Sequence, residues 1–327
     1  MAAGWEQYVS SHPEGNVFQY PQTFDLLRQV PGYSPSVSAV INEADGKLCG
    51  VLVSVLQEEP VFYRRLTARS IVWGGPLADN REAAGMLLRH YVQQIGKRAI
   101  YSQFRNLFPC DSLTESFLQT GFTYLEHLNY LVDTRTDQPD ALQDKMSKSR
   151  ARQIRKGLQG CELKEAAGEE EVLQFYELLK KLYREKVGKP LPPKEFFTGF
   201  YRFMVPAGLG KFLLVKKEGA VIGGIMTPIT PRKAIYEWYI AGMDKEYKDN
   251  HPSILATWYA ILEGQRGGLD HFDFLGAGKP TKDYGVREFK SKFGGQLVNY
   301  GRFEMVHRPL LMKLGTLGLK IYRHIRK

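Results

Sequence analysis

The feature that most constrains the fold is an internal repeat, in which two stretches about 173 residues apart carry the same order of patterns. An acid-glycine pair at 45–46 and another at 218–219 each lie between two β-rich runs. Such a pair predicts a β-hairpin, because glycine adopts the positive φ angle that a tight turn requires. In each stretch an amphipathic helical pattern precedes the hairpin, over residues 23–28 and 196–201.

The repeat continues through the rest of each half, as a strand pattern, a helix pattern and a second short strand. These segments cover residues 70–76, 81–95 and 99–104 in the first half, and residues 234–243, 254–265 and 271–275 in the second. Phe117 and Phe289 then each begin a helical pattern that leads to a final strand. The repeat therefore predicts an α/β fold (α+β, with mixed sheets) that is duplicated in tandem.

A polar linker over residues 134–140 separates the two halves. We predict a first domain over residues 1–139 and a second over residues 140–307, which begins with a linking basic helix. The pattern of residues 308–327 predicts a separate basic amphipathic helix, with leucines and isoleucines on one side and cations on the other. Such a helix packs on its own domain or lies on an anionic membrane surface, and both alternatives stay open.

Composition limits the partners of the chain. Its 327 residues include 43% hydrophobic ones and carry a formal net charge of +10. The composition is that of a globular protein, and its positive charge makes polyanions plausible binding partners. These could be nucleic acid, anionic lipid head groups or phosphorylated substrates. The amino-terminal residues show no signal-peptide pattern, and no segment approaches the ~18 uninterrupted apolar residues of a membrane span. We therefore expect a cytoplasmic location, with possible peripheral association at the inner face of the membrane.

Motifs for metals and nucleophiles are missing from the sequence. Cys49, Cys110 and Cys161 lie far apart, and the seven histidines form no H-E-x-x-H cluster. This spacing predicts no metal site and fits a reducing compartment. The glycines at 276 and 278 follow a strand pattern, but the six-residue dinucleotide fingerprint is absent.

A basic segment follows the linker. Residues 145–156 contain six cations and no acid. A solvated helix that crosses between domains is one interpretation, and a positive wall that faces an anionic ligand is the other.

The stretch over residues 270–304 combines glycines with cations and is the predicted chemical centre. Asp273 either bonds the N–H groups of the turn that follows it or lies in a substrate site. Lys290 lies between Phe289 and Phe293, which can anchor the segment in a core. Lys290 is then either an exposed surface lysine or a partly desolvated cation that stabilises negative charge on an oxyanion or holds a phosphate.

Several motifs together resemble the Fem family of peptidoglycan interpeptide-bridge aminoacyltransferases, which are built from two GNAT-like acyltransferase domains. The resemblance covers nearly the whole chain, and its most specific part is the last pair of motifs. The motifs are HPEGNVFQ at 12–19, WGGP at 73–76, SRARQIRK at 149–156, HPS at 251–253, FDFLGAG at 272–278 and FKSKFGG at 289–295.

The resemblance implies transfer of an amino acid from aminoacyl-tRNA to an amine on a lipid- or nucleotide-linked muropeptide, without a further cofactor. Lys290 would occupy the catalytic lysine position, where it stabilises the reacting acyl centre. Arg28, Lys189 and Lys194 would bind phosphate groups. The other residues expected to bind substrate are Arg105, Tyr239, Asp273, Gly276, Gly278 and Arg287.

An acetyl-CoA enzyme of the same fold is the nearest rival. Such enzymes bind pyrophosphate with a glycine-rich turn between the fourth strand and the next helix, whereas residues 78–81 and 245–252 lack those glycines. The absence of these glycines therefore disfavours ordinary acetyl-CoA binding. Two alternatives remain open: an N-acyltransferase that acts on another cell-envelope acceptor, and an inactive protein that binds nucleic acid or a membrane surface.

Overall fold

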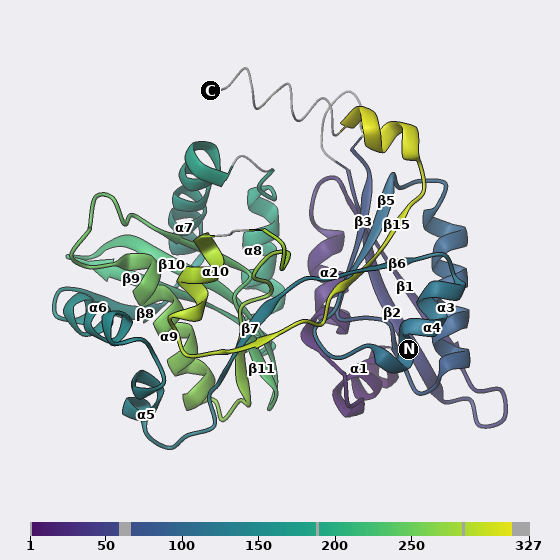
Figure 1. Ribbon diagram of the computed structural model, residues 1–327, viewed down its shortest axis with the longest axis horizontal. Helices are drawn as coiled ribbons and strands as arrows, with labels where there is room; N and C mark the ends of the chain where they lie inside the picture. The colour runs from purple at the N-terminus through teal and green to yellow at the C-terminus, as the bar shows by residue number, and fades with distance from the viewer. Residues whose placement is uncertain (1, 59–66, 188–189, 283–284, 316–327) are drawn as a thin grey trace. The chain divides into compact units, whose positions relative to one another are not determined.

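The computed structural model describes residues 2–58, 67–187, 190–282 and 285–315. The chain divides into two compact units, and each contains a mixed sheet flanked by helices (Figure 1). The first unit contains the residues up to Glu126 together with those from Tyr300 onward, and the second contains His127–Asn299. Among the described residues no helix has the length and apolar character that crossing a bilayer requires.

In the first unit the sheet order is β1-β2-β3-β5-β15-β6, with β4 paired to β2. Helices α1 and α2 lie on one side of this sheet and α3 and α4 on the other (Figure 1). The elements are α1 (Ala2–Ser11), the 3-10 turn η1 (Val17–Gln19), α2 (Pro21–Arg28), β1 (Tyr33–Ile41), β2 (Leu48–Gln57), β3 (Arg69–Trp73), β4 (Leu77–Ala78), α3 (Arg81–Ile95), β5 (Tyr101–Arg105), α4 (Asp111–Gln119), β6 (Thr123–Leu125) and β15 (Arg302–Val306).

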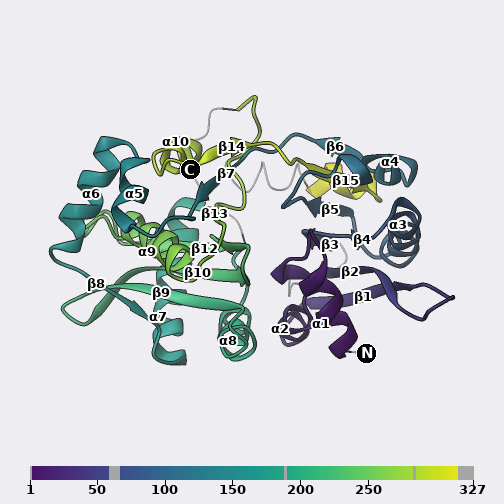
Figure 2. The same ribbon diagram turned by 90° about the horizontal axis from the view of Figure 1, so that it is seen from below.

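In the second unit the sheet order is β14-β7-β13-β11-β10-β9-β8, with β12 paired to β10. Helices α7 and α8 cover one face of this sheet and α9 the other (Figure 2). The elements are β7 (Asn129–Asp133), α5 (Pro139–Asp144), α6 (Lys148–Leu158), β8 (Glu162–Glu165), α7 (Glu169–Leu182), the π-turn η3 (Tyr183–Val187), α8 (Lys194–Phe203), β9 (Gly210–Lys217), β10 (Ala220–Thr230), β11 (Ala234–Tyr236), β12 (Tyr239–Gly242), α9 (Pro252–Arg266), β13 (His271–Asp273), α10 (Gly285–Ser291) and β14 (Gln296–Val298).

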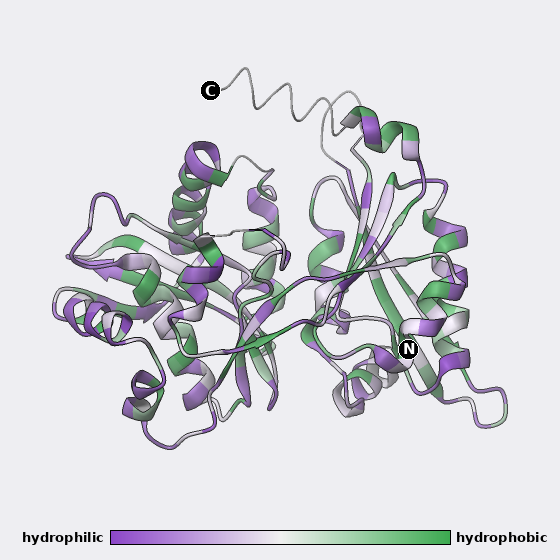
Figure 3. Cartoon of the chain, in the orientation of Figure 1, coloured by the Kyte–Doolittle hydropathy of each residue, from purple (hydrophilic) through white to green (hydrophobic). Residues whose placement is uncertain are grey.

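The apolar patterns place a core in each unit. In the first unit Phe117 and Phe303 stack with ring centroids 4.0 Å apart, and Phe104 packs edge-on against Phe117. In the second unit α9 is buried along most of its length, and Trp258 is among its largest fully buried side chains. Figure 3 shows green, apolar segments within the strands of both sheets, alongside white and purple ones.

The predicted duplication of a mixed α/β fold is confirmed. The hairpin β1–β2 matches β9–β10, and α3 matches α9. The parallel pair β3–β5 matches the parallel pair β11–β13. The strand predicted over residues 234–243 differs in detail, because it breaks into β11 and β12 at Glu237 and Trp238.

The two halves exchange their last strands, which the repeat does not reveal. β7 follows β6 along the chain but pairs with β13 and β14, whereas β15 follows β14 and pairs with β5 and β6. Each sheet is therefore completed by a strand from the other half of the sequence. The compact units consequently change after Glu126 and after Asn299, whereas the sequence places its boundaries after residues 139 and 307.

The predicted C-terminal helix lies mostly outside the described residues, which end at 315. Within the described part, Leu310 and Leu314 are 77% and 64% exposed.

Candidate active site

The candidate site lies where the parallel strands β11 and β13 end. Their register pairs Tyr236 with Asp273, so the residues that follow, Glu237 and Phe274, leave the sheet side by side. The N–H of Glu237 donates to the carbonyl of Asp273 at 2.8 Å, which extends the pairing by one step. The carboxyl ends of parallel strands are the usual position for ligands in open α/β sheets.

Lys290 reaches this position from α10. Its ammonium Nζ donates to the carbonyls of Phe274 at 2.8 Å and Gly276 at 2.9 Å, and it lies 2.9 Å from Glu237 Oε1. An ammonium has three N–H donors, so each one has an acceptor here. The Lys290 side chain is only 9% exposed, which makes the interpretation as an exposed surface lysine wrong.

Glu237 is the acidic partner of Lys290, and the sequence analysis did not single it out. It is 7% exposed, and the Thr257 hydroxyl lies 3.5 Å from its Oε2. Burial raises the pKa of Glu237, while the charge and hydrogen bond of Lys290 act in the opposite direction. The pair therefore places two opposite charges in an environment that contains little water.

Asp273 and Asn129 hold the backbone of the turn after β13. Asp273 Oδ1 accepts from Asn129 Nδ2 at 2.7 Å and from the N–H of Leu275 at 2.5 Å, and Asn129 Oδ1 accepts from the N–H of Gly276 at 2.8 Å. Asp273 Oδ2 is buried and has no hydrogen-bond partner among the described residues. Burial accordingly raises the pKa of Asp273.

The conformation of this turn explains its glycines. The φ angles of Gly276 and Gly278 are +130° and +83°, in the region that disfavours residues with a Cβ. The φ angle of Leu275 is also positive, at +53°. This backbone aims the carbonyls of Phe274 and Gly276 at Lys290. Gly276 and Gly278, which the sequence analysis predicts to bind substrate, thus shape the environment of Lys290.

Arg287 holds the loop that follows. Its guanidinium donates to the carbonyls of Ala277 at 3.0 Å and Lys282 at 3.1 Å, and it also bonds the carbonyl of Lys279. These contacts tie α10 to the loop and so fix the position from which Lys290 projects. The arrangement brings Lys290, Asp273, Gly276, Gly278 and Arg287 into one neighbourhood.

The remaining predicted residues lie elsewhere. Tyr239 packs against Phe196 and Phe197, and Lys194 is the first residue of α8. Arg28 and Arg105 belong to the first unit, where Arg28 forms an exposed ion pair with Asp25 and the Arg105 guanidinium stacks over Trp73 at 4.5 Å. Lys189 lies outside the described residues.

Arg150 links the basic helix α6 to α10. Its guanidinium carbon lies 4.5 Å from the ring centroid of Phe289 and 4.4 Å from that of Phe293, and Nη2 donates to the carbonyl of Phe289 at 3.1 Å. Arg150 is 3% exposed, and burial lowers its pKa to about 10. The two phenylalanines four residues apart, Phe289 and Phe293, are the signal that could have indicated an aromatic contact for a cation.

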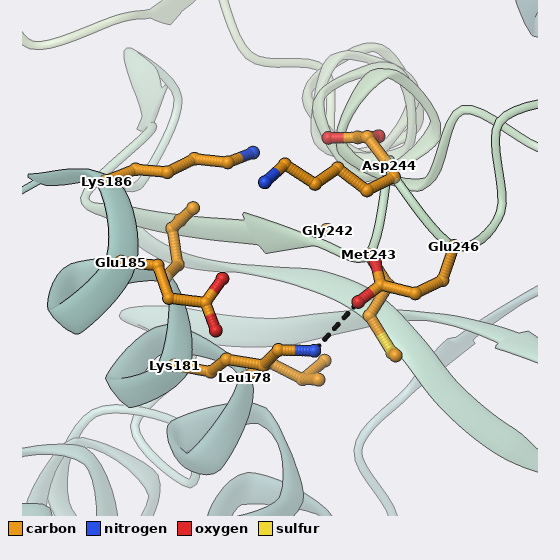
Figure 4. A pocket seen from close by; sticks show the side chains of 10 residues that line it. Leu178, Lys181, Glu185, Lys186, Gly242, Met243, Asp244 and Glu246 are labelled. Atoms are coloured by element: carbon orange, nitrogen blue, oxygen red, sulfur yellow. Dashed lines mark hydrogen bonds and ion pairs between the residues drawn. The ribbon is translucent and has the colours of Figure 1, made fainter.

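A carboxylate occupies the amino-terminal end of α9. Asp244 Oδ1 accepts from the N–H of Ser253 at 3.1 Å, and Oδ2 accepts from its hydroxyl at 2.7 Å. Helix amino termini attract anions, so the Asp244 carboxylate occupies a position that could otherwise bind a phosphate. The lining of a nearby pocket includes Lys186, Asp244 and Glu185, and also Lys181 and Glu246, which pair at 2.7 Å (Figure 4).

Comparisons with known proteins identify the fold. Residues 144–291, within the second unit, match the family model described as the acetyltransferase (GNAT) domain. No curated protein matches the sequence. The structure of FemX aligns over 96% of this chain and 98% of that chain, with a TM-score of 0.73 and 17% identity.

Two further solved structures are similar. A tandem GNAT protein from the clavulanic acid biosynthesis pathway aligns over 94% of this chain and 93% of its own, with a TM-score of 0.58 and 12% identity. The C-terminal domain of a putative lysylphosphatidylglycerol synthetase from Agrobacterium fabrum aligns over 90% and 94%, with a TM-score of 0.56 and 13% identity. The chain thus has a Fem-like tandem GNAT fold, as the sequence analysis predicts.

Proposed function

We propose that the protein is an aminoacyltransferase that moves an aminoacyl group from aminoacyl-tRNA to an amine of a lipid- or nucleotide-linked peptidoglycan precursor. The observation that carries this proposal is the FemX-like fold over nearly the whole chain, together with an acyltransferase domain over residues 144–291 that contains Lys290. The fold alone is compatible with several acyl donors and acceptors, so the site must discriminate among them.

In the proposed reaction the acceptor amine attacks the ester carbonyl carbon of the aminoacyl-tRNA. A C–N bond forms, a tetrahedral intermediate with a negatively charged oxygen results, and the ester C–O bond breaks. The amine loses one proton, and the departing ribose oxygen gains one, so the products are an amide and a free tRNA hydroxyl. The negative charge on the intermediate is what a fixed cation would stabilise.

Lys290 is the residue that we assign to this task. Its charge lies in a region with little water, where electrostatic interactions weaken less than in solvent. The carbonyls of Phe274 and Gly276 and the carboxylate of Glu237 accept from all three N–H donors of its ammonium and fix its position. A direct bond to the oxyanion therefore requires that one of these contacts be exchanged during the reaction. Glu237 acts through Lys290 and is a positioning residue.

Asp244 supports a donor other than a CoA thioester. Its carboxylate binds the amino-terminal end of α9, the place at which GNAT enzymes hold the CoA pyrophosphate. Two negative groups would compete for one helix terminus, and the segment over residues 245–252 offers no glycine-rich turn as a substitute.

A phospholipid is the second candidate acceptor, because the chain also shares its fold with the putative lysylphosphatidylglycerol synthetase domain. Its lower TM-score, 0.56 against 0.73 for FemX, places it second. In that case the attacking group would be a lipid hydroxyl and the product an ester.

The test is a transfer assay with charged tRNA as donor and, in parallel, nucleotide-linked muropeptide, lipid-linked muropeptide and phosphatidylglycerol vesicles as acceptors. Acetyl-CoA replaces the tRNA in a second series. Transfer from tRNA to a muropeptide supports the proposal. Transfer only to the vesicles selects the lipid acceptor, and transfer only from acetyl-CoA refutes the donor assignment. The inactive-protein alternative requires no transfer in any combination.

A further inference from the structure

Helix α6 presents a stripe of cations on its exposed face. Lys148, Arg152 and Arg155 follow an i, i+4, i+7 spacing, which places them on one side of a helix, and all three are exposed. We call these three residues the α6 stripe. At 1.5 Å per residue it extends about 10 Å along the helix axis. Figure 3 shows α6 largely in the purple of hydrophilic residues.

The opposite face of α6 is anchored in the second unit. Ile154 is fully buried, and the Arg150 guanidinium packs against the rings of Phe289 and Phe293. Gly157 permits close approach to the neighbouring loop, because a Cβ there would lie 2.5 Å from the carbonyl oxygen of Asn250. The stripe is therefore displayed on a helix whose inner face is packed, so a ligand meets charges at fixed spacing.

The α6 stripe has no counter-ions within the part of the chain that the structure describes. None of its three side chains forms an ion pair there, and residues 145–159 contain no acid. The neighbouring Lys156 differs, since it pairs with Asp249 at 2.6 Å. Three exposed cations without acidic partners leave a local positive potential that an external anion would neutralise.

The chemistry of the stripe favours a phosphodiester backbone over a membrane surface. Helices that lie on a bilayer combine cations with aromatic or leucine side chains that enter the lipid. The exposed residues next to the stripe are Ser149, Lys156 and Gln159, and the one exposed apolar side chain of α6, Leu158, is only 37% exposed. Cations in a row at fixed spacing, including two arginines, suit successive phosphates of a nucleic acid strand.

We infer that the α6 stripe is a docking surface for the phosphodiester backbone of an RNA, away from the acyl group that is transferred. The inference rests on the proposed function, in which the donor is a tRNA. It adds a contact with the body of that donor, which is distinct from the Lys290 site. Contacts of this kind set affinity and position without reading the base sequence.

The test uses a charge-neutral variant of the stripe, Lys148→Gln with Arg152→Gln and Arg155→Gln. A matched control neutralises one lysine and two arginines that are exposed in the first unit, as Arg89→Gln with Lys97→Gln and Arg98→Gln. Binding of uncharged tRNA is measured by fluorescence anisotropy over a range of salt concentrations. The loss of three phosphate contacts should reduce the slope of log affinity against log salt by about 2 to 3, with no change in the control. Equal slopes in the stripe variant and the wild type overturn the inference.

Two further measurements separate this inference from the proposed function. Co-sedimentation with phosphatidylglycerol vesicles tests whether the α6 stripe binds a membrane surface. A stripe variant that loses vesicle binding but retains tRNA binding refutes RNA docking. In the transfer assay, the wild type should prefer full-length aminoacyl-tRNA to a short acylated 3′ oligonucleotide, and the stripe variant should lose this preference. If the wild type shows no transfer but the stripe variant still loses tRNA affinity, the proposed function fails and the docking surface stands.

Discussion

Lys290 Nζ lies 2.9 Å from Glu237 Oε1, and the two side chains are only 9% and 6% exposed. Removal of one partner from a buried ion pair leaves the other charge without compensation, which costs about 3 to 5 kcal/mol. We therefore expect Glu237→Gln to lower the free energy of unfolding by about 3 kcal/mol, measured by urea denaturation. The double variant Glu237→Gln with Lys290→Met should recover part of this loss, because no isolated charge remains. Additive effects of the two changes would show that the pair is not coupled.

Activity should depend on Lys290 far more than on Lys292, the lysine two residues further along the chain. We expect Lys290→Gln to lower kcat of the transfer reaction by about 10²-fold or more, as expected for loss of a group that stabilises an oxyanion. The control is Lys292→Gln, one residue beyond the end of α10, whose ammonium pairs with Glu288 near the surface. Steady-state kinetics of both variants checks this expectation. A similar kcat for the two variants would remove Lys290 from the mechanism.

The pKa of Asp273 predicts a pH dependence of stability. Burial raises this pKa above the usual value of about 3.9, so the folded protein retains a proton that the unfolded chain releases. Stability therefore falls as the pH rises through the interval between the two values. Asp273→Asn lacks this titration, so the wild type should lose stability relative to the variant as the pH rises above the usual aspartate pKa, which urea denaturation can measure.

Asp133 provides a control with the opposite sign. Its hydrogen bond with Arg135 lowers its pKa, so its contribution to stability is present above the usual aspartate pKa and lost at lower pH. Relative to Asp133→Asn, the wild type should gain stability as the pH rises. The same trend in both comparisons would contradict the assignment for Asp273.

The charge of Arg150 should matter less to folding than its volume. No acidic side chain pairs with Arg150 among the described residues, and its buried guanidinium packs against the rings of Phe289 and Phe293. We expect Arg150→Met to change the free energy of unfolding by less than about 1.5 kcal/mol, because an apolar side chain can replace a buried ion without loss. Arg150→Ala should cost about 2 to 4 kcal/mol, since it opens a cavity beside Phe293. Equal losses for Arg150→Met and Arg150→Ala would instead assign the energy to the guanidinium and its hydrogen bond to Phe289, which both variants lack.

Local patterns predicted most of the fold, because each acts within a few residues. The acid-glycine pairs at 45–46 and 218–219 produce turns with Gly46 at φ +68° and Gly219 at φ +80°, between paired strands. The exchange of β7 and β15 was not predictable in the same way. Both strands have the alternation that either sheet accepts, and pairing partners depend on contacts far apart in the sequence.

The candidate site was predicted only in part for a related reason. Lys290, Asp273 and the glycines lie in one continuous stretch, which composition makes visible. Glu237 and Asn129 reach the same place from other parts of the chain, 53 and more residues away from Lys290. A single glutamate within a strand pattern is ordinarily an exposed polar residue, so only the break between β11 and β12 reveals its inward position.

The exchanged strands also restrict how the gene for such a chain can change. A deletion after the first half would remove β15 and leave β5 and β6 without the strand that pairs with both. The second half expressed alone would lack β7, which is the strand that pairs with both β13 and β14. Unpaired strand edges promote aggregation, so neither copy can be lost without harm to the other. Once the copies had exchanged strands, the duplication could diverge in sequence but not shorten to a single domain by simple truncation.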